Sequence, residues 1–203
     1  MQIISGIRSI LSNPLFYIFF HKITNVYKHK TDPFVQVINK NKNKIKVLDI
    51  GCGPCEILEL LKNNIEYYGI DTNKRYIDYA KKKYKRRGFF INEEFSKKLN
   101  KKLPKFNYVI MCGLIHHLDE KQINLILKNL RKNINKKTLI LTLDPLYTEN
   151  QNYLEKKIMG ADRGQNIRNE KEITNLFRNF KIKKKIFKQI YIPYTWIFLK
   201  IKI

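Results

Sequence analysis

The chain has 203 residues, of which 43% are hydrophobic, and it carries a formal net charge of +24. This length supports one well-packed domain, and the apolar content excludes a disordered chain. The excess positive charge has two interpretations: a surface that binds nucleic acid or anionic membrane, or lysines spread over an ordinary surface. We favour the second, because the lysines are scattered and the Lys-free stretches 47–61 and 106–120 coincide with the expected core.

The start of the chain is apolar without being a clear membrane segment. Arg8, Asn13 and Pro14 interrupt the apolar residues 3–20, and no basic stretch precedes them. This pattern is atypical of a signal peptide or a transmembrane span. We expect an N-terminal helical cover over residues 1–40, with a helix lying on a membrane surface as the alternative. Three cysteines without a regular framework indicate a reducing, cytoplasmic location.

Strand and helix patterns alternate along the next hundred residues. Short apolar runs rich in β-branched side chains predict strands at residues 45–50, 67–70, 89–91, 108–111 and 138–143. Apolar residues at helical spacing predict a helix after Pro54, one through Ile77, Ala80 and Tyr84, and one from Ile123 to Leu130. This alternation predicts a doubly wound, mostly parallel sheet with helices on both faces.

The last part of the chain has a different pattern. It predicts a loop at residues 159–168, a helix at 170–180 and two late strands at 181–188 and 194–203, which gives seven strands in all. No linker divides the chain, so we expect a single domain, residues 1–203. Within it, residues 44–145 form the core that binds a cofactor, and residues 146–203 form the substrate side.

The strongest functional signal is the segment Val-Leu-Asp-Ile-Gly-Cys-Gly-Pro-Cys, in which Gly51 and Gly53 follow the first strand. Glycine lets a ligand approach the backbone closely, and Asp71, 20 residues after Gly51, ends the next strand. A carboxylate there can accept hydrogen bonds from both ribose hydroxyls of a nucleoside cofactor. The alternative is a structural turn with Asp71 as an ordinary helix cap. Glu56 stands where a dinucleotide fingerprint has its third glycine, which argues against NAD and FAD.

These segments resemble class I S-adenosylmethionine-dependent methyltransferases, in particular the branch often labelled type 11 or 12. Residues 49–53 are similar to motif I of that family, residues 68–71 to its second motif, and residues 106–118 to its strand-four segment. The resemblance covers roughly residues 44–145 and implies a Rossmann-like fold. A narrower similarity to a bacterial subgroup extends to residues 6–12, 162–168 and 192–195.

The resemblance also implies a cofactor site. Gly51 and Gly53 would flank the methionine moiety of S-adenosylmethionine, Asp71 would bind the ribose, and Cys112 would contribute backbone contacts. The residue that contacts adenine stays open between Asn92, Glu93 and Glu94. The full set expected to bind the cofactor is Asp49, Gly51, Cys52, Gly53, Asp71, Thr72, Cys112 and Gly113.

His116 and His117 follow the fourth strand, where the acceptor should lie, and histidine exchanges protons near neutral pH. Either one could be the general base, with His117 preferred; the alternative is that one packs against or caps the next helix. Asp162, Arg163 and Arg168 form a second candidate set, in which the arginines could bind a carboxylate or phosphate of the substrate or instead fix their own loop. Tyr194 could line the same pocket or belong to the core.

The cysteines raise the question of a metal. Cys52, Cys55, Cys112 and His116 could converge, but there is no second C-x-x-C and the cofactor turn already explains the first two, so we expect no metal.

Taken together, the motifs and the resemblance predict methylation of an oxygen or nitrogen of a small-molecule acceptor, including an anionic one. Two alternatives remain: an RNA or DNA methyltransferase, and a non-catalytic protein that binds the cofactor or associates with membrane.

Overall fold

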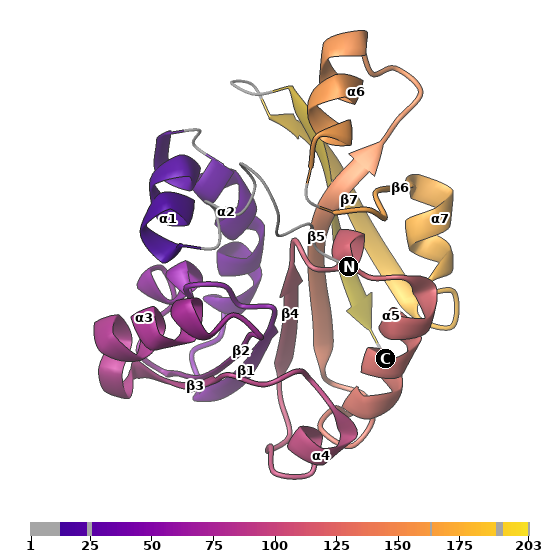
Figure 1. Cartoon of the computed structure of the whole chain (residues 1–203). Helices are drawn as coiled ribbons and strands as arrows, with labels where there is room; N and C mark the ends of the chain where they lie inside the picture. Colours follow the sequence, from indigo (N-terminus) through magenta and orange to yellow (C-terminus); the bar gives the residue numbers. More distant parts are fainter. Residues whose placement is uncertain (1–12, 24–25, 163, 190–192, 203) are drawn as a thin grey trace.

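The computed structural model describes residues 13–23, 26–162, 164–189 and 193–202 (Figure 1). The expectations for residues 1–12, Arg163 and Ile192 therefore lie outside the described residues. The helices are α1 (Pro14–Ile23), α2 (Val26–Ile38), α3 (Lys74–Tyr84), α4 (Lys97–Asn100), α5 (Glu120–Leu130), α6 (Tyr153–Gly160) and α7 (Glu170–Asn175), with short 3-10 turns η2 (Glu56–Glu59), η3 (Lys85–Arg87) and η4 (Ile115–His117). The strands are β1 (Ile45–Ile50), β2 (Ile65–Ile70), β3 (Gly88–Ile91), β4 (Tyr108–Cys112), β5 (Leu139–Tyr147), β6 (Arg168–Asn169), β7 (Lys181–Gln189) and β8 (Tyr194–Lys202).

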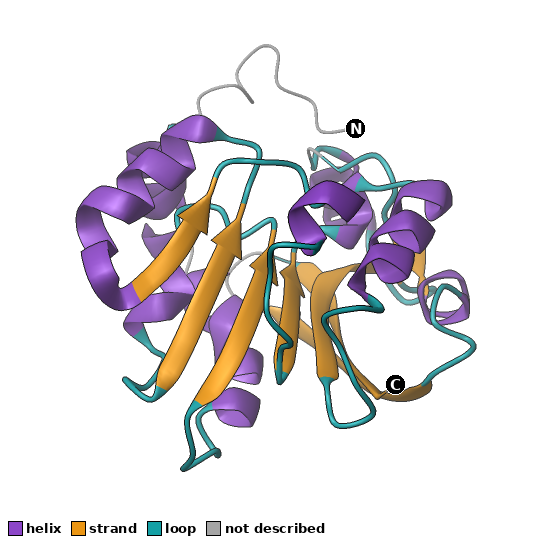
Figure 2. Ribbon diagram, turned by 90° about the horizontal axis from the view of Figure 1, so that it is seen from below, coloured by secondary structure: helices purple, strands orange, loops and turns teal. Residues whose placement is uncertain are grey.

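The strands form one sheet, with helices packed beside it (Figure 2). Their order is β3-β2-β1-β4-β5-β8-β7, and the two-residue β6 pairs with β5 off this path. The first five strands pair in parallel, whereas β8 is antiparallel to both of its neighbours, β5 and β7. This is the expected doubly wound, mostly parallel sheet of seven strands, with β6 as a short addition. The strand order reverses between β1 and β4, which creates the switch point where such sheets bind ligands.

Two apolar cores lie on the two faces of the sheet. One contains Phe34 and Ile38 from α2 together with Ile77 and Ala80 from α3. The other contains residues of α4, α5 and α7, and its buried helical side chains include Leu99, Ile123, Leu130 and Ile173. Each fully buried aliphatic side chain contributes about 1.5–3 kcal/mol, so these two layers fix the sheet and the strand ends that carry the site.

Local sequence signals explain where the helices begin. The Asn73 side chain accepts a hydrogen bond from the Arg75 N–H at 3.0 Å and so caps α3 directly after β2. Asp119 and Gln122 form a reciprocal capping box at the start of α5. These caps hold the loops after β2 and β4 in place, and both loops belong to the candidate site.

The structure corrects four of the expected elements. The helix expected after Pro54 is only the 3-10 turn η2, because Cys55 has φ 60°, a left-handed conformation that interrupts a helix beginning at Pro54. β5 does not end at Asp144 but continues to Tyr147, because β8 pairs with it as far as Pro145. The expected loop at 159–168 begins only after α6, and α7 stops at Asn175, before the expected 180.

Candidate active site

The turn after β1 adopts a conformation that favours glycine. Gly51 and Gly53 have φ values of 72° and 55°, in the left-handed region. A Cβ atom on Gly51 would lie 3.0 Å from Cδ1 of Leu114, whereas one on Gly53 would meet no atom within 4 Å. The turn is therefore tightly packed at Gly51 and leaves room for a ligand at Gly53.

Asp71, at the end of β2, is tied to this turn. Its Oδ2 accepts a hydrogen bond from the Gly53 N–H at 2.9 Å, and its Oδ1 accepts one from the Asn73 N–H at 2.7 Å. Both contacts fix the carboxylate beside the turn, and each carboxylate oxygen has further lone pairs for a ligand hydroxyl. The Asp71 carboxylate therefore lies directly beside the glycine turn.

A cavity of about 320 Å³ lies between the turn, the end of β2 and the segment after β4. Its lining includes six of the eight residues predicted to bind the cofactor: Gly51, Gly53, Asp71, Thr72, Cys112 and Gly113. Glu93 and Glu94 also line it, whereas the Asn92 amide donates to the backbone oxygens of Asp71 and Thr72 at 3.0 Å. Tyr17 of α1 also lines it, so α1 contributes one side chain to the cavity wall.

Asp49 and Cys52 belong to the layer beneath the cavity. The buried Asp49 carboxylate accepts a hydrogen bond from the Tyr67 hydroxyl at 2.7 Å, and burial raises the pKa of Asp49 to about 7. Burial also raises the pKa of the Cys52 thiol, which keeps that thiol protonated at neutral pH. A Cβ on Gly69 would lie 3.0 Å from the sulfurs of both Cys52 and Cys55, so these side chains pack against the sheet.

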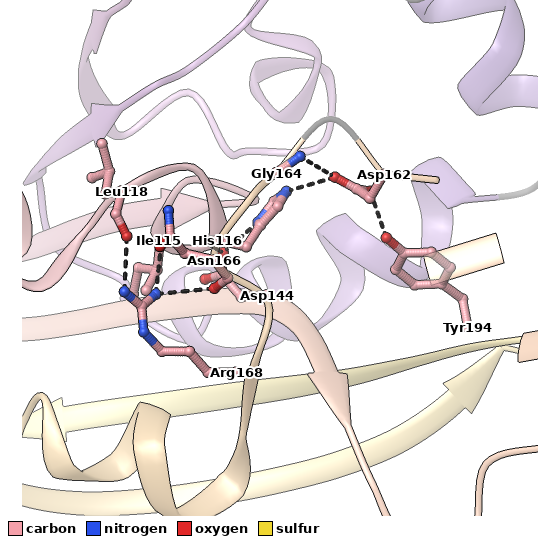
Figure 3. A network of polar contacts seen from close by, with 9 residues as sticks. All are labelled: Ile115, His116, Leu118, Asp144, Asp162, Gly164, Asn166, Arg168 and Tyr194. Carbon is pink, nitrogen blue, oxygen red and sulfur yellow. Dashed lines mark hydrogen bonds and ion pairs between the residues drawn. The ribbon is translucent and has the colours of Figure 1, made fainter. Parts of the chain in front are cut away.

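The two histidines have different environments. His117 lines the cavity, whereas His116 is 6% exposed and points into a polar network. In that network Nδ1 of His116 lies 2.8 Å from Oδ1 of Asp144, and Nε2 lies 3.3 Å from Oδ1 of Asp162 (Figure 3). The His116 and His117 rings are 4.0 Å apart between centroids. The predicted histidines are therefore adjacent, but only His117 contacts the cavity.

The carboxylates and the imidazole of this network stabilise one another's charged forms. Burial alone would lower the pKa of His116, but the carboxylates of Asp144 and Asp162 raise it overall. Burial would raise the pKa of Asp162, but His116 and the Tyr194 hydroxyl, which donates to Oδ2, hold it below its ordinary value. The Gly164 N–H donates to Oδ1 of Asp162 at 2.7 Å. The network thus joins Tyr194, Asp162, His116 and Asp144.

Arg168 holds the backbone around the histidines together. Its guanidinium donates to the carbonyl oxygens of Ile115 and Asn166 at 3.1 Å and of Leu118 at 2.8 Å (Figure 3). These contacts match the structural alternative, an arginine that fixes its loop. Its partner in the prediction, Arg163, lies outside the described residues.

Two members of the polar network around His116 were not predicted as site residues. Asp144 follows the apolar run of β5 in an Asp-Pro pair, but nothing in the sequence links it to a histidine 28 residues earlier. Gly164 packs directly on His116: a Cβ there would lie 2.0 Å from Cδ2 of that ring. Only the folded loop reveals this contact.

Comparison with known proteins agrees with the fold and the turn. Residues 47–137 match the family described as methyltransferase domain. The comparison with curated proteins gave no significant match. Among solved structures, a SAM-dependent methyltransferase from Archaeoglobus fulgidus is 17% identical with a TM-score of 0.69, and the alignment covers 92% of this chain and 99% of that one.

Two further structures are similar in fold. Magnesium protoporphyrin IX methyltransferase from Synechocystis PCC 6803, with bound SAH, is 17% identical with a TM-score of 0.63, covering 87% of this chain and 83% of that one. Mitomycin 7-O-methyltransferase is 13% identical with a TM-score of 0.60, covering 79% of this chain, which spans only 49% of that protein.

The fold, the glycine turn with its distant acid, and the family match agree on one class of protein. Residues 47–137 match a methyltransferase domain, and the sheet has the Rossmann-like fold of class I methyltransferases that use S-adenosylmethionine. Within the part of the chain that the structure describes, no helix is long and apolar enough to cross a membrane.

Proposed function

We propose that the chain transfers a methyl group from S-adenosylmethionine to an oxygen or nitrogen of a small-molecule acceptor. The observation that carries this proposal is that His117 and the cofactor-turn residues line one cavity of about 320 Å³. A cavity of this size, partly closed by Tyr17, suits a cofactor and a small acceptor better than a polymer.

The chain's own residues have distinct tasks in this proposal. S-adenosylmethionine supplies a methyl group that its sulfonium already activates. The protein therefore mainly positions the acceptor and excludes water. Gly51 and Gly53 admit the methionine end, Asp71 accepts hydrogen bonds from the ribose, and Thr72, Cys112 and Gly113 complete the wall. Asp49 and Cys52 support the turn from below.

On the acceptor side, His117 is the histidine that contacts the cavity, and its neutral imidazole can accept the acceptor's proton. His116 has a positioning role, since it is buried and held by Asp144 and Asp162. Asp162 and Tyr194 hold the loop against it, and Arg168 holds the backbone. An anionic acceptor depends on Arg163 in this proposal, because the Arg168 guanidinium already donates to carbonyl oxygens.

The three cysteines are buried or half-buried and form no disulfide, which favours a reducing, cytoplasmic location.

The test is to incubate the protein with methyl-labelled S-adenosylmethionine and a cell extract separated into low-molecular-weight, RNA and protein fractions. The proposal expects label in the low-molecular-weight fraction, reduced at least tenfold by His117→Ala. Label confined to RNA or protein would contradict it.

A nucleic-acid methyltransferase is the second candidate, favoured by a basic groove between α2, β7 and β8. This groove has a volume of about 460 Å³, and its lining includes Lys40, Lys183, Lys184, Lys185, Lys188 and Lys200. Lys184 and Lys188 are already paired with Glu170 and Glu155, which weakens the case. This candidate would be supported if the chain bound RNA with a steep salt dependence and lost that binding in the double variant Lys183→Glu, Lys185→Glu.

A membrane-associated protein is the third candidate. Leu15, Phe16 and Phe19 of α1 are 66%, 55% and 63% exposed. Flotation with anionic vesicles that is lost when all three become Ser, without turnover on any extract fraction, would favour this candidate over catalysis.

A further inference from the structure

Three side chains beside the cavity form a cluster with the composition of a metal site. His116 and His117 come from η4, and Asp162 comes from the loop after α6. One ligand atom from each lies within 4.8 Å of the other two. None of them is a cysteine, and only His116 is shared with the set of Cys52, Cys55, Cys112 and His116 for which the sequence led us to expect no metal.

Two of the three side chains are already oriented as metal ligands usually are. His116 places Nδ1 against the buried Asp144 carboxylate at 2.8 Å, which directs Nε2 toward Asp162 (Figure 3). A carboxylate behind the second ring nitrogen is the usual support of a metal-bound histidine. Asp162 is held in turn by the Gly164 N–H and the Tyr194 hydroxyl.

The spacing also fits. Metal–ligand bonds of 2.0–2.1 Å in tetrahedral geometry place two ligand atoms about 3.3 Å apart. Nε2 of His116 and Oδ1 of Asp162 are separated by 3.3 Å. Two imidazoles and one carboxylate suit zinc and related transition metals, whereas calcium and magnesium prefer all-oxygen sites.

We propose that His116, His117 and Asp162 bind one divalent transition-metal ion of the zinc type on the acceptor side of the cavity. Three protein ligands leave a further coordination position. Since His117 lines the cavity, that position would be open to the acceptor.

The consequence for chemistry rests on the proposed function; the binding of the ion does not. An acceptor hydroxyl that coordinates the ion has a lowered pKa, so its O–H bond breaks and the proton leaves to solvent. The acceptor oxygen then forms a bond to the methyl carbon as the S–CH3 bond of S-adenosylmethionine breaks, and S-adenosylhomocysteine leaves. The acceptor class is therefore an alcohol, a phenol or a hydroxy acid, and the product is an O-methyl compound. In the ion-bound protein His117 is a ligand, and the role of proton acceptor falls to water.

The test uses the full chain, dialysed against a chelator and titrated with Co²⁺ while its visible absorption is recorded. We expect one Co²⁺ per chain, with the absorption of a four- or five-coordinate site, displaced by Zn²⁺. His117→Ala and Asp162→Asn should each weaken binding by at least tenfold, and Asp144→Asn by about 10–100-fold, because it supports a ligand from behind. Asp78→Asn, an exposed carboxylate on α3 that pairs with Lys74, should leave the affinity unchanged.

A second measurement separates the possible failures. Thermal stabilisation by S-adenosylhomocysteine on the same samples reports whether each variant is folded and binds the cofactor. Absence of Co²⁺ uptake, or equal uptake by all variants, would overturn the metal site and leave the His116–Asp162 contact as a hydrogen bond of a protonated imidazole. If the cofactor still stabilises those samples, the proposed function is untouched by that result.

Discussion

The His116 imidazole in η4, just after β4, meets the Asp144 carboxylate of the neighbouring strand β5, with Nδ1 2.8 Å from Oδ1. The same Oδ1 accepts the His116 backbone N–H at 3.1 Å, and Asp144 is only 1% exposed. This pair anchors η4 to the sheet and so determines where His117 enters the cavity.

Removing Asp144 should therefore cost much more than removing an exposed acid. Asp144→Ala leaves a buried polar ring without its main partner, and we expect the free energy of unfolding to fall by about 3 kcal/mol. Asp78→Ala, which breaks the exposed ion pair with Lys74, should cost about 0.5 kcal/mol or less. Urea unfolding followed by circular dichroism measures both, and equal losses would contradict the account.

Alanine substitutions at Gly164 and Gly160 test whether the loop after α6 packs tightly on His116. A Cβ on Gly164 would lie 2.0 Å from Cδ2 and 2.7 Å from the carbonyl oxygen of His116, whereas one on Gly160 would meet nothing within 4 Å. Gly164→Ala should lower stability by about 1–3 kcal/mol, because the loop must move. Gly160→Ala, at the end of α6, should be neutral or stabilising by about 0.5 kcal/mol. The thermal unfolding midpoint of Gly164→Ala should thus fall, whereas that of Gly160→Ala should stay the same or rise.

Arg168 should not tolerate replacement by lysine. Its planar guanidinium reaches three carbonyl oxygens at once, and a single ammonium cannot reproduce that fork. We expect Arg168→Lys to lose about 2 kcal/mol in urea unfolding. Arg75→Lys, an exposed position on α3, should stay within about 0.5 kcal/mol of the parent, and a similar value for Arg168→Lys would refute the bridging role.

Asp49 predicts a pH dependence with a definite sign. Its pKa is raised to about 7 in the folded chain, against an ordinary value of 3.8, so the folded state binds more protons between these values. The contribution of Asp49 to stability is therefore complete below pH 3.8 and is lost as the pH rises through about 7. In Asp49→Asn, which keeps an oxygen for Tyr67, this loss should disappear. Stability curves of both proteins from pH 4 to about 8 test this, and parallel curves would show that Asp49 ionises normally.

The alternation of apolar strands and helical spacing was sufficient to predict the sheet, because buried strands and amphipathic helices have distinct periods. The short η2 was not predictable in this way. Ile57, Leu60 and Leu61 do have the spacing of a helical face. The left-handed conformation of Cys55 nevertheless limits this segment to the 3-10 turn η2. Local backbone conformation at a single residue has no periodic signature.

The cofactor side of the site was more predictable than the acceptor side. Gly51, Gly53 and Asp71 lie in short motifs at strand ends, whose meeting point follows from the parallel topology. The partners of His116 come from β5 and from the loop after α6, and their contacts depend on how that loop packs. Sequence identified Asp162 and Tyr194 as candidates without indicating that they bind each other.

The most direct test of the account is a thermal-shift titration with S-adenosylmethionine and S-adenosylhomocysteine on the parent chain and Asp71→Ala. A ligand that binds only the folded state stabilises it by about 2.7 kcal/mol at a hundredfold excess over Kd. The account predicts a clear shift for the parent chain that is lost in Asp71→Ala, since that carboxylate is tied to the glycine turn. A folded parent chain that neither ligand stabilises would contradict the assignment of this cavity to the cofactor.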